Sequence, residues 1–232
     1  MIILSLNTST KQYSLALTDR RAVLGEYILL SGSSHFTDLM PCLEDLLQKT
    51  NLTFGQLEGI AVAVGPGSFT GIRVGLALAK GLSQGIGLPV IGVPTLSALA
   101  SQVVYAKEDI CPLLSSRKHE VFAALFKLDQ HNHLTRIEND TCLPMEKLSG
   151  IVKRETIFIG NDFPEQGPLV KKYIGETALL APPNLWNLRA SSIGALGEQS
   201  LEHGYSDDVS ELVPVYLRDA DIRTAKPLFS GS

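Results

Sequence analysis

The strongest constraint on the fold is a run of five apolar residues, Ile60–Val64, that leads directly into the glycine loop Gly65–Gly71. The run shows no polar alternation, which predicts a strand buried on both faces. Such strands belong to sheets that other elements cover on both sides. A helix is predicted directly after the loop, over 70–84, so this part of the chain is typical of an α/β protein.

One order of elements, strands first and then strands alternating with helices, is predicted twice. The first half has strands at 2–6, 14–18, 23–30, 60–64 and 90–93 and helices at 38–49, 70–84 and 95–104. The second half has strands at 111–114, 120–127, 134–137 and 157–160, a short helical piece at 145–148 and helices at 164–173 and 191–203. We therefore expect a duplicated α/β unit with lobes at 1–105 and 106–218 and a flexible tail at 219–232.

Composition narrows the class of protein. The chain has 232 residues, of which 44% are hydrophobic and 19% charged, and this balance excludes a disordered chain. Lys and Arg number 20 against 24 Asp and Glu, which gives a net charge of -4. A domain that grips nucleic acid alone usually carries a basic excess, so any contact with nucleic acid is expected to depend on a partner.

Cysteine usage and hydropathy indicate a cytoplasmic protein. Cys42, Cys111 and Cys142 are scattered without a CxxC pair, which argues against a disulfide framework and a structural zinc site. No apolar run approaches the roughly 18 residues that span a bilayer, and no basic stretch precedes the apolar start at Met1–Leu4. We expect a reducing compartment, no membrane segment and no signal peptide.

The glycine loop does not match the standard phosphate-binding or nucleophile patterns. Gly71 is followed by Ile72-Arg73 rather than Lys-Ser/Thr, the spacing after Gly67 is one residue too long for a dinucleotide fingerprint, and Ser68 lacks the flanking glycines of a nucleophile elbow. Two interpretations stay open. One is a tight structural turn, which we favour; the other is an anion cradle at the helix N-terminus. The cradle would consist of Gly65, Gly67, Ser68, Thr70 and Gly71.

The two helices of the first half carry more apolar surface than one sheet can cover. The helix at 70–84 has Arg73 and Lys80 as its charges, and small residues recur every fourth position at Gly71, Gly75 and Ala79. A helix that is apolar nearly all round is buried on two sides. The helix at 38–49 also has a wide apolar arc. The second half could cover both helices, or their surface could be an interface, and the sequence leaves both open.

No arrangement of nucleophile, base and orienting group can be assembled from the sequence. Asn7 ends the first strand, where an ATP-handling enzyme of this element order would place an acid. The matching turn of the second half, Ser115–Lys118, also lacks an acid, and Asp162 has the context of a turn residue. The histidines show no metal-binding pattern, so we predict no catalytic residue, no metal site and no peptidase activity.

The segment Gly65–Leu76 (GPGSFTGIRVGL) resembles the TsaB (YeaZ) family, and further matches occur at Ile3–Ser9, Gly92–Leu96 and Pro214–Arg218. The resemblance implies an actin-like (ASKHA) fold, in which two lobes of ribonuclease-H-like units each contain a mixed sheet flanked by helices. It implies that the chain is not an enzyme but a noncatalytic partner of TsaD and TsaE. These subunits transfer threonylcarbamoyl from its adenylate to N6 of the adenosine beside the anticodon, in tRNAs that read codons starting with A.

The family also implies where partners and cofactors bind. ATP or ADP and the metal are expected on the partner subunits and tRNA is contacted mainly through the complex, while the chain alone is expected to form a homodimer. The partner interface carries over to Leu39, Met40, Leu43, Leu46, Leu47, Ile72, Leu76, Ala79 and Lys80. The family usually has Asp in place of Asn7 and Asp-Ala-Arg in place of Ser115–Arg117. The alternative function is an actin-like ATPase or phosphotransferase that uses the loop at 65–71.

Overall fold

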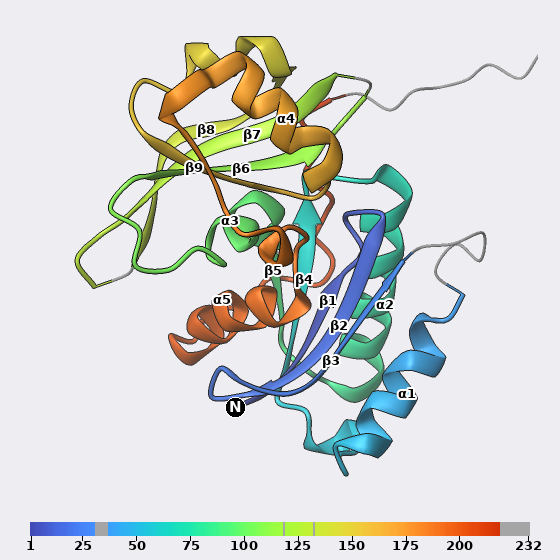
Figure 1. Ribbon diagram of the computed structural model, residues 1–232. Coiled ribbons are helices and arrows are strands. Elements are labelled where there is room, and N and C mark those ends of the chain that lie inside the picture. Colours follow the sequence, from blue (N-terminus) through green and yellow to red (C-terminus); the bar gives the residue numbers. More distant parts are fainter. Residues whose placement is uncertain (31–36, 118, 132, 219–232) are drawn as a thin grey trace, which may run out of the picture.

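The computed structural model describes residues 1–30, 37–117, 119–131 and 133–218, and the tail predicted at 219–232 lies outside these ranges. Two mixed sheets form two lobes, each flanked by helices (Figure 1). This is the predicted α/β architecture of two lobes. No helix in the described ranges combines the length and the apolar character needed to span a bilayer.

The first sheet has the strand order β3-β2-β1-β4-β5. Its strands are β1 (Ile2–Asn7), β2 (Gln12–Asp19), β3 (Ala22–Leu30), β4 (Gly59–Gly65) and β5 (Val90–Pro94). The first three are antiparallel, and β4 and β5 add in parallel. Every residue of β4 is buried, as the absence of polar alternation predicted.

The second sheet has the order β8-β7-β6-β9-β10, which repeats the first sheet strand for strand. Its strands are β6 (Asp109–Ser115), β7 (Glu120–Leu128), β8 (Leu134–Pro144), β9 (Thr156–Gly160) and β10 (Ala178–Leu180). The strands β6, β7 and β8 are antiparallel, while β9 and β10 add in parallel. The duplication is thus visible in the topology, although β8 runs seven residues beyond its predicted end and β10 was not predicted.

The helices follow the predicted order with altered ends. They are α1 (Leu39–Lys49), α2 (Phe69–Ile86), α3 (Thr95–Ala100), α4 (Phe163–Ile174) and α5 (Ala190–Glu202), with short 3-10 helices at Phe54–Gln56, Met145–Gly150, Gly175–Thr177 and Pro183–Leu185. The α3 helix ends four residues earlier than predicted. Its last turn tightens, because the N–H groups of Gln102 and Val103 donate to carbonyls three residues back.

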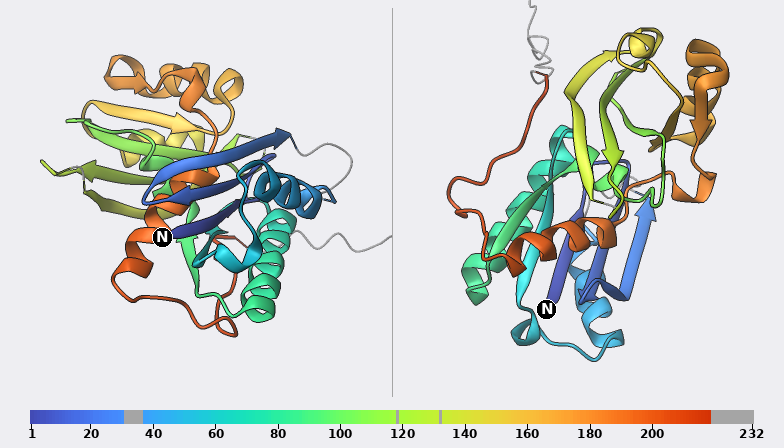
Figure 2. Two further views of the ribbon diagram at one scale, coloured as in Figure 1. Left: turned by 90° about the horizontal axis from the view of Figure 1, so that it is seen from below. Right: turned by 90° about the vertical axis from the view of Figure 1, so that its left-hand side faces the viewer.

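The lobes exchange helices, which the predicted division at residue 105 did not include. The α3 helix lies against β6 of the second sheet, and α5 lies across β1, β2 and β4 of the first (Figures 1 and 2). The segment after α5 then follows the first lobe, where the Asp207 N–H donates to the Val90 carbonyl and the Val215 N–H to the Val64 carbonyl. The boundary therefore separates the two sheets but not the helices that cover them.

Candidate functional site

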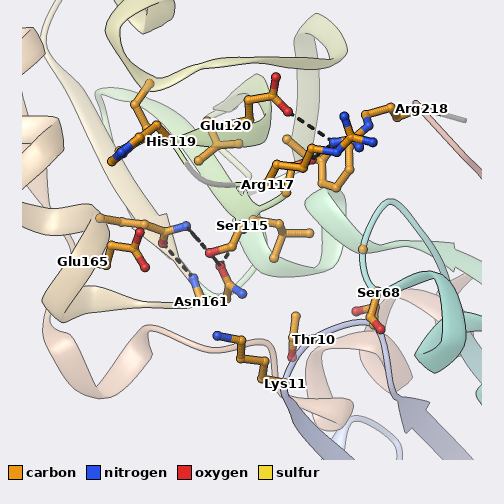
Figure 3. Close-up of a pocket in the computed structure, with 18 of the residues that line it drawn as sticks. Thr10, Lys11, Ser68, Ser115, Arg117, His119, Glu120, Asn161, Glu165 and Arg218 are labelled. Carbon is orange, nitrogen blue, oxygen red and sulfur yellow. Dashed lines mark hydrogen bonds and ion pairs between the residues drawn. The ribbon is translucent and has the colours of Figure 1, made fainter. Parts of the chain in front are cut away.

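A cavity of about 530 Å³ lies between the lobes (Figure 3). The first lobe contributes the turn after β1 and the glycine loop, and the second lobe contributes the β6–β7 turn and the start of α4. The segment after α5 adds Tyr216 and Arg218. Residues with polar or charged side chains in its lining are Ser9, Thr10, Lys11, Ser68, Ser115, Ser116, Arg117, His119, Glu120, Asn161, Glu165, Gln166, Tyr216 and Arg218.

The glycine loop packs its backbone against the turn after β1. The Ser68 N–H donates to the Ser9 carbonyl at 2.7 Å. A Cβ at Gly67 would overlap that carbonyl, and a Cβ at Gly71 would overlap the carbonyl of Thr8. These close approaches explain the glycines structurally, as the favoured turn interpretation requires. Anion binding by the loop stays a prediction.

The predicted cradle is divided between this packing and the cavity. The Ser68 hydroxyl accepts from the Gly71 N–H at 3.2 Å and caps α2. Gly67 and Ser68 line the cavity, whereas Gly65 is buried and its Cβ position is occupied by the Val215 carbonyl. Thr70 is exposed and does not line the cavity. The structure therefore brings only part of the predicted set to the cleft.

The wall of the cleft in the second lobe satisfies its own polar groups. The Asn161 Oδ1 atom accepts from the Ser115 N–H at 2.9 Å, and the Gln166 Oε1 atom accepts the N–H groups of Asn161 and Asp162. Asp162 caps α4 by accepting from the Glu165 N–H, which is the structural role the sequence indicated.

One ion pair at the cleft joins the segment after α5 to the second lobe. The Arg218 guanidinium contacts the Glu120 carboxylate at 3.2 Å and the Ser116 hydroxyl at 3.4 Å. Arg218 belongs to the segment that follows the first lobe, while Glu120 and Ser116 belong to the second (Figure 3). Lys118, the last residue of the predicted turn, lies outside the described residues.

Asn7, the last residue of β1, is fully buried and uses both ends of its amide. Its Oδ1 atom accepts from the N–H and hydroxyl of Ser9 at 3.1 and 2.7 Å. Its Nδ2 atom donates to the Leu188 carbonyl at 2.9 Å. Within the described ranges, no group of three or more His, Cys, Asp or Glu residues could hold a metal ion.

Cys42, Cys111 and Cys142 are free thiols. Burial raises the pKa of Cys111 far above its ordinary value, so this thiol stays protonated. Burial, reinforced by the nearby Asp38 and Asp45 carboxylates, also raises the pKa of Cys42. A raised pKa is the opposite of what a nucleophilic cysteine needs.

Most of the residues predicted to face a partner are core residues of the first lobe, which corrects that prediction. Seven of the nine are at most 4% exposed and join one cluster beneath α1 and α2, namely Leu39, Leu43, Leu46, Leu47, Ile72, Leu76 and Ala79. They point inward because the sheet of the same lobe needs cover on that face. Met40 is exposed and Lys80 is half-buried, so these two side chains can still contact a partner.

The outward face of α2 is the apolar surface that the sequence did not separate from the core. Ala77 and Gly81 are exposed, and Val74, Leu78 and Leu82 are half-buried. These residues recur at helical spacing between the buried positions. The signal was the nearly continuous apolar character of the helix, but periodicity alone does not say which arc faces the sheet.

Comparisons with known proteins agree with this architecture. The family described as "TsaD: tRNA N6-adenosine threonylcarbamoyltransferase" matches residues 30–226. The tRNA threonylcarbamoyladenosine biosynthesis protein TsaB of Bacillus subtilis is 29% identical over 224 residues, covering 95% of this chain and 96% of the relative. TsaB of Escherichia coli is 28% identical over 232 residues, covering 94% and 95%.

Solved structures share the fold. YeaZ from Pseudomonas aeruginosa superposes with a TM-score of 0.74 at 23% identity, covering 93% of this chain and 100% of that one. An activator of 2-hydroxyisocaproyl-CoA dehydratase from Clostridium difficile, solved with bound ADPNP, has a TM-score of 0.52 at 12% identity, covering 90% and 99%. The fold is therefore the actin-like one that the resemblance implied.

Proposed function

This chain belongs to the family matched over 30–226, as one of its TsaB (YeaZ) members, and from that premise we propose that it serves tRNA threonylcarbamoyladenosine biosynthesis as a noncatalytic subunit. Its partner is TsaD, with TsaE joining the pair. The complex transfers threonylcarbamoyl from threonylcarbamoyl-AMP to N6 of the adenosine beside the anticodon, in tRNAs that read codons starting with A. The subunit works in the cytoplasm and contacts tRNA mainly through the complex.

The observation that carries the proposal is the outward face of α2 between Ala77 and Gly85, where small and apolar residues lie beside Lys80 and Gln84. Exposed small residues at Ala77, Gly81 and Gly85 allow a second helix to approach closely, and a Cβ at Gly81 or Gly85 would meet no atom within 4 Å. Half-buried Leu78 and Leu82 supply apolar area beside them. This face suits a partner helix, either from TsaD or, when the chain is alone, from a second copy.

Size-exclusion chromatography with light scattering tests the interface. We expect Ala77→Asp to abolish co-elution with TsaD, because a charge would be buried between two helices. The circular dichroism spectrum should stay unchanged, since Ala77 is exposed and the substitution costs about 0.5 kcal/mol of helix propensity. Ile137→Asp, at an exposed apolar position of the second lobe, is the matched control and should still pair. If Ala77→Asp still co-elutes with TsaD, the partner does not bind this face of α2.

The cofactors are assigned to the partners. We expect calorimetric titration of the isolated chain with ATP and Mg²⁺ to give no tight binding, because the end of β1 holds Asn7 rather than a carboxylate. Tight binding that is lost in Gly67→Val would favour the alternative, an ATPase or phosphotransferase that uses the glycine loop. Any side chain at Gly67 would overlap the backbone of Ser9. Circular dichroism should therefore confirm that Gly67→Val is folded.

A further inference from the structure

The chain returns from the second lobe to the first through the crossing segment, Leu185–Arg189, which links β10 to α5. Trp186 and Leu188 of this segment are buried. Asn187 between them adopts φ +116°, a region that residues other than glycine rarely occupy. Such a conformation persists only where the surroundings fix it, so the contacts of the crossing segment need explanation.

The second lobe holds one side of the crossing segment. The Asn187 N–H donates to the Gly160 carbonyl at 2.9 Å. The Trp186 indole donates to the Ala181 carbonyl at 2.9 Å, and its ring meets Phe163 edge to face at 5.1 Å between centroids. These contacts fasten the segment to the ends of β9 and α4.

Two side-chain amides hold the other side of the segment, Asn7 at the end of β1 in the first lobe and Gln102 just after α3, the helix that packs between the two sheets. The Asn7 Nδ2 atom donates to the Leu188 carbonyl at 2.9 Å. The Gln102 Nε2 atom donates to the carbonyls of Leu185 and Asn187 at 2.8 and 3.1 Å. The Gln102 Oε1 atom accepts from the Arg189 N–H at 2.8 Å. Asn7 and Gln102 thus bind four main-chain groups of the crossing segment, and the Ser14 hydroxyl of β2 also donates to the Leu188 carbonyl, at 3.3 Å.

We propose that Asn7 and Gln102 are positioning residues that lock the crossing segment and so hold the two lobes in one fixed orientation. This role needs amides, because each side chain must donate and accept at once. Asn7 accepts from Ser9 while it donates to Leu188, and an aspartate could not make the second bond when ionised.

The lock is stabilised by its burial. Asn7 is 0% exposed, and Leu188 is 1% exposed, so water cannot readily replace their hydrogen bond when the lobes move. The Arg189 guanidinium adds an ion pair to the Glu26 carboxylate at 2.6 Å, and the Glu26 side chain is 4% exposed. A rotation of one lobe about the crossing segment would break these bonds together.

Trp186 is the only tryptophan of the chain, so its fluorescence reports on the crossing segment directly. We expect Asn7→Ala and Gln102→Ala to increase quenching of this emission by acrylamide. Hydrogen exchange of a peptide spanning 181–193 should become about tenfold faster, the change expected when one net hydrogen bond of a closed segment is lost. Asn7→Leu, which keeps the approximate size and loses the donor, should behave like Asn7→Ala.

Ser83→Ala is the matched control. Its hydroxyl is buried and donates to the Leu88 carbonyl at 2.6 Å, so the variant loses one side-chain hydrogen bond within the first lobe. Quenching and exchange at 181–193 should stay at wild-type values in this variant. If the variants of Asn7 and Gln102 lower the unfolding midpoint but match the control in both readouts, the two residues are ordinary core hydrogen bonds and the proposal is overturned.

Two further outcomes are decisive. A wild-type response from Asn7→Leu would show that the donor is unnecessary and would also overturn the proposal. If Asn7→Ala does not fold, Gln102→Ala decides by the same two readouts. Gln102 is half-buried and lies outside the strands, so its substitution leaves the first sheet intact. Pairing with TsaD at the α2 face is separate from the crossing segment, so failure of either idea leaves the other standing.

Discussion

The two lobes join their fourth strand to the following helix in different ways. In the first lobe, β4 meets α2 through glycines whose backbone touches the backbone of Thr8 and Ser9. In the second lobe, β9 meets α4 through Asn161 and Asp162, whose N–H groups are bound by the Gln166 side chain. The strand order is the same in both lobes, so topology alone does not dictate how this joint is sealed.

Both walls of the cleft carry polar side chains, but these come from different segments. In the first lobe they come mainly from the turn after β1, at Ser9, Thr10 and Lys11, and in the second lobe from the β6–β7 turn and the start of α4. A joint made by close backbone packing leaves few side chains to point at the cavity. A joint made by side chains places amide and hydroxyl groups there, and Figure 3 shows Ser115 and Asn161 at this wall. The two lobes thus share one strand order but differ in how the fourth strand connects to the helix that follows it.

The largest expected effect contrasts a glycine of α2 with one of α4. Gly71→Ala should destabilise the chain by about 3 kcal/mol, because its Cβ would overlap the Thr8 carbonyl, which is backbone and cannot move aside. Gly167→Ala should be neutral or stabilise by up to about 1 kcal/mol, since its Cβ would meet side chains at ordinary contact, 3.5 Å. Urea unfolding measures both, and equal effects would remove the distinction between the joints.

A smaller effect is expected from the side chain that seals the second joint. Gln166 is 3% exposed and also donates to the Ser115 hydroxyl at 3.2 Å. Gln166→Ala should cost about 2 kcal/mol in urea unfolding, because the N–H groups of Asn161 and Asp162 lose their acceptor. Gln166→Glu, which keeps the acceptor, should restore part of that loss. A neutral alanine variant would mean that water from the cavity replaces the amide fully.

The caps of the two helices should differ only slightly. Ser68→Ala and Asp162→Ala each remove an acceptor from the first turn and should cost about 1 kcal/mol. The Asp162 variant should lose slightly more at low salt, because the carboxylate also interacts with the helix dipole. Thermal unfolding at two salt concentrations measures the difference, and a larger salt effect at Ser68 would contradict it.

The smallest effect is expected at the ion pair that joins the segment after α5 to the second lobe. Glu120→Gln should cost less than about 1 kcal/mol, because the pair with Arg218 is open to solvent on one side, with side chains 36% and 24% exposed. The loss should shrink further in high salt. A cost that is both large and independent of salt would show that the pair is a main tie between the lobes.

The candidate site was only partly predictable from the sequence. The glycine loop and its interpretation as a structural turn were indicated, and the absence of an acid at Asn7 could be read directly. The residues that face a partner could not be predicted, because the sequence shows that α1 and α2 are apolar but not which side of each helix the sheet covers. Leu43 and Ala77 illustrate this, since both lie on apolar helices and one is buried while the other is exposed.

The sequence by itself determined the duplication and the order of the strands and helices except β10, because local periodicity and buried runs such as Ile60–Val64 act over a few residues. Only the tertiary structure decided that α5 returns to the first sheet and that Asn7 binds Leu188, a partner 181 residues away. Contacts of that separation depend on how the lobes pack, and no local pattern encodes them.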